Sequence, residues 1–329
     1  METPLFTDTL IVITGAAGFI GSGVARHLGD QGYDNLVLVD DIGESESWKN
    51  LLGKKCFEFV PKDSLFEWLE GRESEIAAFI HLGACSDTTV RDGSFVMETN
   101  YCYTVRLAEY ALEHGHRFIY ASSAATYGDG SRGFSDDHAS LDELRPLNLY
   151  GYSKHLFDLW AESHGVLDRV VGLKYFNIFG PNEYHKGRMA SMVLHMHRHI
   201  LETGNVSLFE STDRDRYADG DQVRDFYYVK DAAARTCDFL HTDVSGLFNI
   251  GFGTPHTWNE LARAVFAAMG REPSITYVPM PADLAGRYQN YTCADMSKLQ
   301  RALPYTNAYT FEGAVADYVQ NYLEPGETW

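Results

Sequence analysis

Short apolar runs alternate with amphipathic stretches through the first half of the chain. The runs have the length and β-branched content of buried strands, and the stretches between them repeat apolar residues at helical spacing. Strands separated by helices are typical of βαβ units, whose strands are parallel. We therefore predict strands at Leu10–Thr14, Leu36–Asp40, Phe57–Val60, Ala77–His81, Arg117–Ser122 and Val170–Tyr175, and helices at Phe19–Asp30, Ser94–His114 and Tyr152–His164.

The order of elements becomes less regular after Asn177. The pattern there predicts helices at Met189–Glu202, Trp258–Met269 and Phe311–Tyr322, and short strands at Ser207–Phe209 and Leu247–Ile250. The charged segment 213–225 has turn composition and few apolar residues, so we expect a solvated loop. The chain as a whole predicts an α/β fold: a Rossmann-type doubly wound parallel sheet in residues 1–176 and a smaller C-terminal substrate-binding lobe in residues 177–329, with a soft boundary that segments can cross.

Composition and charge narrow the class of protein. Of the 329 residues, 45% are hydrophobic, which is enough to bury a full core. The longest apolar runs are far shorter than the roughly 18–20 residues of a membrane-spanning helix. Acidic residues occur near the N-terminus where a secretory signal carries cations, so we expect a cytoplasmic protein without a membrane segment. The formal net charge of −19 disfavours nucleic acid as a partner, because a phosphate backbone would be repelled.

Cysteines and histidines indicate neither disulfides nor a metal. The five cysteines are widely spaced and form no Cys-x-x-Cys pair, so we expect buried free thiols. His195 and His199 have the spacing of helical neighbours, but the residues between them lack the glutamate of a zinc-protease helix. We therefore predict no metal site.

Three glycines follow the first predicted strand. Gly15, Gly18 and Gly21 form G-x-x-G-x-x-G, which permits a tight turn, a close backbone approach to a pyrophosphate and close packing of helix on strand. The helix that begins with Phe19 and Ile20 would point its positive N-terminus at the phosphates. The motif predicts a dinucleotide site in the first domain.

Two further strand ends strengthen this prediction. Asp40 and Asp41 end the second predicted strand, where an acid can accept hydrogen bonds from the adenosine ribose hydroxyls. Small residues follow the fourth predicted strand and would let a flat ligand lie against the backbone; the candidate contacts are Leu82, Gly83, Ala84, Cys85 and Ser86.

A tyrosine and a lysine provide candidate chemistry. Tyr150 and Lys154 are four residues apart and would share one helical face. A phenol has an ordinary pKa near 10, so it acts as a base at neutral pH only when a nearby cation and hydrogen-bond donors favour its phenolate. Lys154 would supply that charge, and Ser123, after the fifth predicted strand, could bond a substrate hydroxyl or the carbonyl that it becomes.

Together these features resemble the extended short-chain dehydrogenase/reductases, and among them the ADP-L-glycero-D-manno-heptose 6-epimerase family. The resemblance covers nearly the whole chain. Its more specific segments are GACSDTT (83–89), YASSAATYG (120–128), NLYGYSK (148–154), YFNIFGPNEYHKGRMAS (175–191), RDFYYVKD (224–231) and GRYQ (286–289).

The resemblance implies roles for particular residues. Tyr150 and Lys186 would be the two acid/base residues, supported by Ser123 and Lys154. Further cofactor positions are Lys62, Asn100, Ile178 and Lys186. The substrate positions are Ser123, Asn177, Arg188, His195, Phe209, Glu210, Ser211, Thr212, Arg224 and Tyr288.

The resemblance also implies a reaction: inversion of carbon 6 of ADP-D-glycero-D-manno-heptose, which supplies the heptose precursor of the lipopolysaccharide inner core. It implies a tightly bound NADP, with NAD possible, and a homo-oligomer, in this family a homopentamer. No side chain is basic enough to break the carbon–hydrogen bond at that carbon, whereas hydride transfer to a nicotinamide achieves it through a transient 6-keto sugar. Because hydride must return to the opposite face, a second acid/base residue such as Lys186 has a physical role.

Two positions depart from the family pattern. A lysine that often meets the 2′-phosphate of NADP is here Ser47, with Lys49 close by, which leaves NAD open beside NADP. Arg188 stands where a serine is common, and it would either contact a phosphate or face solvent.

Other functions remain as alternatives. A sugar-nucleotide 4-epimerase would share most of these motifs. A 4,6-dehydratase would place acids after the catalytic serine or threonine, where this chain has Ala124 and Ala125. A non-catalytic cofactor-binding subunit would be expected to lose the tyrosine or the lysine, and both are present.

Overall fold

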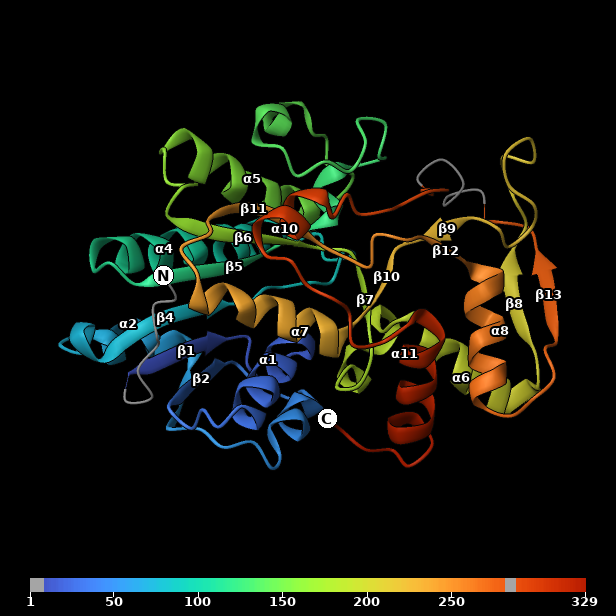
Figure 1. Cartoon of the computed structure of the whole chain (residues 1–329), viewed down its shortest axis with the longest axis horizontal. Helices are drawn as coiled ribbons and strands as arrows, with labels where there is room; N and C mark the ends of the chain where they lie inside the picture. The colour runs from blue at the N-terminus through green and yellow to red at the C-terminus, as the bar shows by residue number, and fades with distance from the viewer. Residues whose placement is uncertain (1–8, 282–287) are drawn as a thin grey trace.

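A seven-stranded sheet organises the larger part of the molecule. The computed structural model describes residues 9–281 and 288–329, and it places the strands in the order β11-β6-β5-β4-β1-β2-β3, each pair parallel (Figure 1). The bounds are β1 (Leu10–Thr14), β2 (Leu36–Asp40), β3 (Glu58–Pro61), β4 (Ile76–His81), β5 (Arg117–Ser123), β6 (Val170–Tyr175) and β11 (Gly246–Ile250). The chain runs outward from β1 in both directions, so the gap between β1 and β4 is a topological switch point, where open α/β sheets bind ligands.

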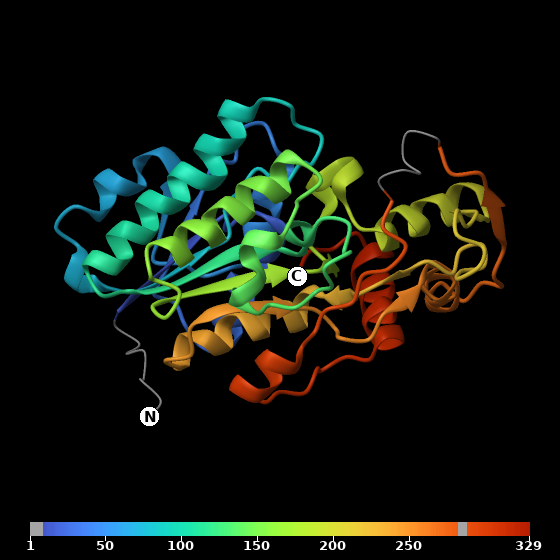
Figure 2. The same ribbon diagram turned by 90° about the horizontal axis from the view of Figure 1, so that it is seen from above.

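Helices cover both faces of this sheet. One face carries α1 (Phe19–Asp30) and α7 (Val229–Asp238), with α10 (Ser297–Ala302) nearby; the other carries α2 (Leu65–Leu69), α3 (Gly93–Met97), α4 (Tyr103–Glu113) and α5 (Leu149–Ser163). Figure 2 shows α4 and α5 on one side of the strands and α7 on the other. Because both faces are covered, alternate residues of β1 enter two different apolar layers: Ile11 and Ile13 pack toward α1 and α7, and Val12 packs toward α4 and α5.

A smaller lobe extends from the carboxyl ends of the strands. Its helices are α6 (Met192–Thr203), α8 (Trp258–Ala268) and α11 (Phe311–Tyr318), which enclose a third apolar core. Its short strands pair as β7 (Asn177–Phe179) with β10 (Phe226–Tyr228), β8 (Val206–Phe209) with β13 (Ile275–Val278), and β9 (Val223–Arg224) with β12 (His256–Thr257). Figure 1 shows α6, α8, β8 and β13 at the end of the molecule opposite the outer helices of the sheet.

The predicted α/β class and parallel sheet are confirmed, with differences at some element ends. The predicted helix Ser94–His114 is interrupted by a π-helical turn, Glu98–Cys102, between α3 and α4. Helix α5 begins three residues before the predicted Tyr152, because the Asn148 side chain caps it by accepting a hydrogen bond of 2.8 Å from Gly151 N. Tyr150 therefore lies in the first turn of α5 rather than before it.

The second half of the chain returns to the sheet. Strand β11, predicted as Leu247–Ile250, pairs with β6 at the edge of the seven-stranded sheet, and α7 packs against α1. Segments beyond residue 176 therefore cross back and complete the sheet layer. The division into 1–176 and 177–329 remains a prediction about domains, with β11 and α7 as the crossing segments.

Two expectations about exposure were wrong in part. The end of segment 213–225 is buried rather than solvated, because Asp225 is 0% exposed and accepts hydrogen bonds from the backbone of Phe252, Gly253 and Ala294. These contacts join the lobe to the sheet. The cysteines are free as expected, but Cys237 is the buried one, whereas Cys56 is exposed and the other three are intermediate. Within the described residues, no helix combines the length and apolar content that crossing a membrane requires.

Candidate active site

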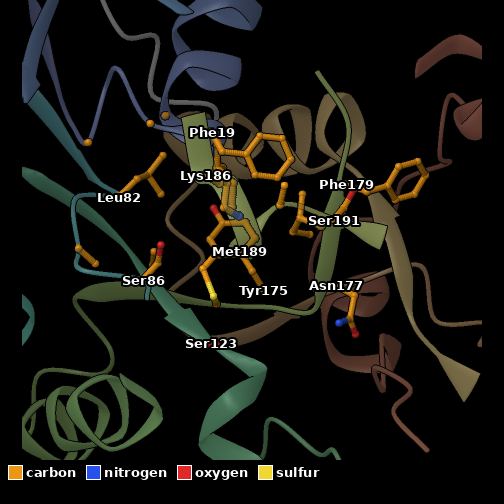
Figure 3. A pocket seen from close by; sticks show the side chains of 18 of the residues that line it. Phe19, Leu82, Ser86, Ser123, Tyr175, Asn177, Phe179, Lys186, Met189 and Ser191 are labelled. Carbon is orange, nitrogen blue, oxygen red and sulfur yellow. The ribbon is translucent and has the colours of Figure 1, made fainter. Parts of the chain in front are cut away.

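A cavity of about 640 Å³ opens at the carboxyl ends of the central strands and extends to the lobe. Most of the predicted cofactor and catalytic residues line it, and so does the predicted substrate residue Asn177. The cofactor and catalytic residues are Gly15, Gly18, Phe19, Ile20, Gly21, Asp40, Asp41, Leu82, Gly83, Ala84, Ser86, Ser123, Tyr150, Lys154, Ile178 and Lys186. The cavity thus lies at the switch point that the strand order defines (Figure 3).

The glycine turn leaves no room for side chains. Gly15 has a φ of +68°, and a Cβ atom there would lie 2.6 Å from the backbone nitrogen of Gly83. A Cβ atom at Gly21 would lie 2.0 Å from the carbonyl oxygen of Gly15. The turn after β1, the loop after β4 and the first turn of α1 therefore touch through backbone atoms, which is the arrangement that a bound pyrophosphate needs.

Asp40 organises the end of β2. Its Oδ2 accepts a hydrogen bond of 2.7 Å from Ala17 N in the glycine turn, and its Oδ1 accepts one of 2.7 Å from Asp41 N. Burial raises the pKa of Asp40, and the backbone donors oppose that rise. The carboxylate therefore holds the turn and faces the cavity where an adenosine ribose would lie.

Asn100 supports the loop after β4. Its side chain accepts a hydrogen bond of 2.8 Å from Cys85 N and donates to Cys85 O at 3.0 Å and to Ser153 Oγ at 3.0 Å. Neither Asn100 nor Cys85 lines the cavity; both lie behind the wall formed by Ala84 and Ser86. Asn100 therefore contributes to the site indirectly, because its hydrogen bonds to the Cys85 backbone hold the loop after β4 in place.

Helix α5 brings Tyr150 to Ser123. Gly151 packs so closely on the turn after β5 that a Cβ atom there would lie 2.7 Å from Ala125 O. Burial raises the pKa of Tyr150, whereas a hydrogen bond with the Ser123 side chain lowers it. Ser123 is therefore placed to stabilise charge on the phenol oxygen.

Lys154 lies one turn further along the same helix. It is 4% exposed, and burial lowers its pKa to about 8, while the negative charge of Asp158 opposes that change. Among the described residues its Nζ has no hydrogen-bond partner. A buried ammonium group with free donors at a cavity wall is suited to bind the hydroxyl groups of a ligand and to favour the Tyr150 phenolate.

The turn Tyr184–Met189 places Lys186 in the same cavity. Gly187, with a φ of +53°, interrupts the helical turn after Lys186. The Lys186 Nζ lies 4.9 Å from the centre of the Phe19 ring. Figure 3 shows Lys186 beside Phe19, with Ser123 on another part of the wall. Burial lowers the pKa of Lys186, and the negative charge of Glu183 opposes this effect. A lysine with a lowered pKa is suited to exchange a proton near neutral pH.

Contacts from distant parts of the chain hold this turn. Asn182, which has a φ of +78°, donates to Ser22 Oγ at 3.0 Å and accepts a hydrogen bond of 2.8 Å from Trp329 N. Glu183 is 0% exposed and accepts hydrogen bonds from Ser191 N at 2.6 Å and from Ser191 Oγ at 2.5 Å. The position of Lys186 thus depends on α1, on α6 and on the C-terminal segment.

An aromatic cluster around Arg224 lies beside the cavity. The Arg224 guanidinium is 4.9 Å from the ring centre of Tyr288 and 5.5 Å from that of Trp258. Trp258 donates its indole N–H to the Tyr288 hydroxyl at 2.7 Å, and the Phe209 ring meets Tyr288 edge-on at 6.3 Å. Arg224 is 7% exposed and forms no ion pair within the described residues. A buried guanidinium without an acid partner is suited to an anionic ligand group.

The predicted residues after β8 lie close to this cluster in the chain. Glu210 pairs with Arg214 at 3.1 Å, and the backbone nitrogen of Ser211 donates to Asp219 at 2.8 Å. Thr212 is exposed. None of these three predicted substrate residues lines the cavity itself.

Three other predicted residues lie outside the cavity wall. Lys62 pairs with Asp63 at 3.5 Å, and His195 lies on α6 without reaching the lining. The Arg188 side chain is 69% exposed, and it contacts Thr89 and Asp87 on the loop after β4. Arg188 therefore faces solvent, one of the two roles expected from the sequence, and it also links two loops. Of the GRYQ segment, residues 286 and 287 lie outside the described residues.

The cavity also contains residues that sequence reasoning missed. These are Ser45, Ala121, Ser122, Tyr175, Phe176, Phe179, His185, Met189, Ala190, Ser191, Met192, Val193, Phe226, Trp258 and Leu261. Several belong to the segment 175–191, whose similarity to a known family was a signal that this whole stretch faces the site. Trp258 carried no such signal, because an aromatic residue at the start of an amphipathic helix is ordinarily part of a core.

Comparisons with known proteins agree with this geometry. The model of the NAD dependent epimerase/dehydratase family matches residues 11–251. The chain belongs to this family, whose members in the extended short-chain dehydrogenase/reductase class use a nicotinamide dinucleotide.

Several relatives of this chain carry one name. An ADP-L-glycero-D-manno-heptose-6-epimerase of Nitratidesulfovibrio vulgaris is 47% identical over 95% of this chain and 98% of its own length. One of Fusobacterium nucleatum is 41% identical over 97% of this chain and 100% of its own length. The solved structure of the Helicobacter pylori enzyme of that name superposes with a TM-score of 0.78 at 30% identity, covering 96% of each chain.

Proposed function

We propose that this protein epimerises ADP-D-glycero-D-manno-heptose at carbon 6 to give ADP-L-glycero-D-manno-heptose. The observation that carries the proposal is the presence of Tyr150 and Lys186 in one cavity, on two different structural elements. A reaction on both faces of one carbonyl group needs two acid/base groups, whereas a simple dehydrogenase needs one. The names of relatives that are similar over nearly the whole chain support the same reaction.

Different side chains have different roles in the proposed reaction. A bound nicotinamide supplies a reversible hydride acceptor. Tyr150, with Ser123 and Lys154 favouring its phenolate, removes the proton from the hydroxyl at carbon 6 or returns it. Lys186 performs the same exchange when the carbonyl group presents its other face.

The cluster of Arg224, Trp258 and Tyr288 is proposed to hold the nucleotide end of the substrate. The guanidinium can pair with a diphosphate, and the aromatic rings can pack on a base or a ribose. Trp258 lines the cavity and also bonds Tyr288, so it connects the reaction site with this cluster. Phe209 completes the aromatic wall.

A dehydratase is the less favourable alternative. Elimination of water needs an acid beside the catalytic serine, and the turn after Ser123 presents Ala124 and Ala125 instead. A 4-epimerase would also act on both faces of one carbonyl group and could use the same Tyr150, Lys154 and Lys186. The shared name of relatives that are similar over nearly the whole chain favours the ADP-heptose reaction over it.

The first expected result is that purified protein, given either epimer of ADP-heptose, produces a mixture of both. Nuclear magnetic resonance of the sugar protons distinguishes the two products. UDP-glucose serves as the control, and it should remain unchanged under the same conditions. Interconversion of UDP-hexoses at carbon 4, with ADP-heptose untouched, would contradict the proposal.

The residues at the end of β2 bear on the choice of cofactor. The resemblance implies NADP, whose 2′-phosphate requires a cation, but this part of the cavity wall consists of Asp40, Asp41, Ser45 and Ser47. Lys49 does not replace the missing lysine, because it pairs with Glu46 at 2.7 Å and lies outside the lining. Acids without a neighbouring cation favour a ribose with a free 2′-hydroxyl. We therefore propose NAD rather than NADP as the preferred cofactor.

The nucleotide released when the purified protein is denatured should accordingly be mainly NAD. Mass spectrometry identifies it. The variant Ser47→Lys places an ammonium group at the position that the family uses, so it should increase the NADP fraction. Lys49→Gln, the matched control, should leave the ratio unchanged. Recovery of NADP alone from the unaltered protein would contradict the proposal.

A further inference from the structure

A fully buried ion pair lies directly behind the catalytic residues. Lys174 on β6 and Asp158 on α5 are each 0% exposed, and Lys174 Nζ lies 2.7 Å from Asp158 Oδ2. Lys174 also donates to Thr126 Oγ1 at 2.8 Å. Asp158 accepts two further hydrogen bonds, from Tyr120 Oη at 2.9 Å and Ser122 Oγ at 2.8 Å. Every oxygen and nitrogen of the pair thus has a partner, as a buried pair requires.

The pair contacts the catalytic machinery on two sides. Asp158 follows Lys154 by four residues on α5, so both side chains lie on one face of the helix. Ser122, which donates to Asp158, precedes Ser123 on β5. Thr126, which accepts from Lys174, donates to the carbonyl oxygen of Ser123 at 2.8 Å. The Asp158 carboxylate therefore reaches the strand of Ser123 through Ser122, and the Lys174 ammonium group reaches the Ser123 carbonyl through Thr126. Asp158 also lies on the helix face of Lys154.

We propose that Asp158 and Lys174 are positioning residues that set the proton affinities of Lys154 and Tyr150 through the balance of their opposite charges. This inference rests on the proposed function of Tyr150 and Lys154. The pair touches neither substrate nor cofactor, because it does not line the cavity. Its effect on the reaction passes through Lys154 and Ser123.

The two charges determine in which direction each substitution should shift the proton affinities of Lys154 and Tyr150. Burial lowers the pKa of Lys154, and the negative charge of Asp158 opposes this effect. Without Asp158, two buried ammonium groups would repel each other and the Tyr150 phenolate would be more favoured. Without Lys174, the unbalanced carboxylate would favour the Lys154 cation and disfavour the phenolate.

Other titratable groups also lie near the pair or near Lys154. They are His81 on β4, Tyr120 and Tyr127 on or after β5, His138, His155 on α5 and Lys298 on α10. Burial lowers the pKa of His138 and of Lys298. Burial lowers the pKa of His81 to about 3, so this imidazole stays neutral. Burial raises the pKa of both phenols and lowers that of His155. The pair is therefore expected to act on the reaction through Tyr150 and Lys154, whereas Lys186 lies on another element of the cavity wall.

The test compares pH profiles of kcat/KM for epimerisation in three variants. Asp158→Asn should move both limbs of the profile to lower pH, and Lys174→Met should move both to higher pH, each by about one unit. The double variant has no unpaired buried charge, so it is expected to fold even where a single variant does not. Asp158 shares α5 with Lys154, and its negative charge raises the pKa of Lys154. The loss of Asp158 should therefore outweigh the loss of Lys174, so the limbs of the double variant should lie between those of the unaltered protein and those of Asp158→Asn.

A matched control separates this role from a structural one. Lys230 and Asp317 form another ion pair of low exposure, at 2.7 Å, between α7 and α11 and away from the cavity wall. Asp317→Asn removes that pair and should lower thermal stability without moving the limbs. If Asp158→Asn, Lys174→Met and the double variant also keep the limbs of the unaltered protein, the pair is only structural and the inference is wrong.

A second measurement does not depend on the substrate. The ultraviolet absorbance of tyrosinate, measured as the difference from a Tyr150→Phe background, follows the ionisation of Tyr150 directly. The pH at which Tyr150 ionises should fall in Asp158→Asn and rise in Lys174→Met. If the protein fails to epimerise ADP-heptose but these shifts occur, the proposed substrate is wrong and the role of the pair stands.

Discussion

Tyr150→Phe is expected to lower the rate of epimerisation by about a hundredfold or more, because one positioned acid/base group typically contributes 10²–10⁴-fold. The substitution removes only the phenol oxygen. That oxygen interacts with Ser123, and Lys154 lies one turn along α5. Because Tyr150 is held by the first turn of α5 and the close packing of Gly151, the ring itself should stay in place. The fold and the bound nucleotide should therefore be retained.

Three measurements check this prediction. Turnover is measured with ADP-heptose, bound nucleotide by mass spectrometry after denaturation, and folding by thermal denaturation. Tyr152→Phe is the matched control, because Tyr152 belongs to the same helix but is 47% exposed. It should keep nearly full activity. An active Tyr150→Phe enzyme would remove Tyr150 from the mechanism.

Lys186→Ala is expected to abolish epimerisation while leaving one half-reaction largely intact. Tyr150 alone can serve the epimer whose hydroxyl faces it, but the opposite orientation depends on Lys186. Removing the ammonium group leaves Phe19, Glu183 and the cavity wall in place, so the defect should be chemical. The loss for the dependent half-reaction should again be about a hundredfold or more.

The asymmetry between two variants provides the measurement. Each half-reaction can be measured separately with an aldehyde or ketone analogue that permits a single hydride transfer. The Lys186 variant should process one face and the Tyr150→Phe variant the other. Lys49→Ala, which removes an exposed lysine of the first domain, is the control and should retain both. Equal failure of both variants on both faces would contradict the two-base mechanism, and normal epimerisation by Lys186→Ala would remove its main chemical support.

The choice of cofactor shows how sequence and structure contribute differently. The sequence placed Ser47 where a lysine is frequent and left open whether Lys49 takes its role. The structure shows Lys49 paired with Glu46 outside the cavity and Ser47 in its wall. In a short 3₁₀ turn, no periodic sequence pattern indicates which side chains point toward the cavity. Only the folded chain therefore shows whether Lys49 takes the place of the missing lysine.

The sequence by itself determined the strands of the first half, the glycine turn and the spacing of Tyr150 and Lys154. Each of these depends on neighbours within a few residues: alternating burial along a strand, absent side chains in a turn, and one helical turn between two groups. Such local rules can be followed along a single chain. The likeness of longer motifs to a known family added Lys186, Arg224 and Tyr288.

Only the tertiary structure decided which distant residues meet. Trp258 joins Arg224 and Tyr288, Lys174 pairs with Asp158 behind the catalytic helix, and Trp329 helps to hold the turn of Lys186 through Asn182. Strand β11 likewise returns from the second half of the chain to the edge of the sheet. These contacts form because packing in three dimensions satisfies buried charges and polar groups. Their partners lie far apart in the chain, where no local periodicity relates one position to the other.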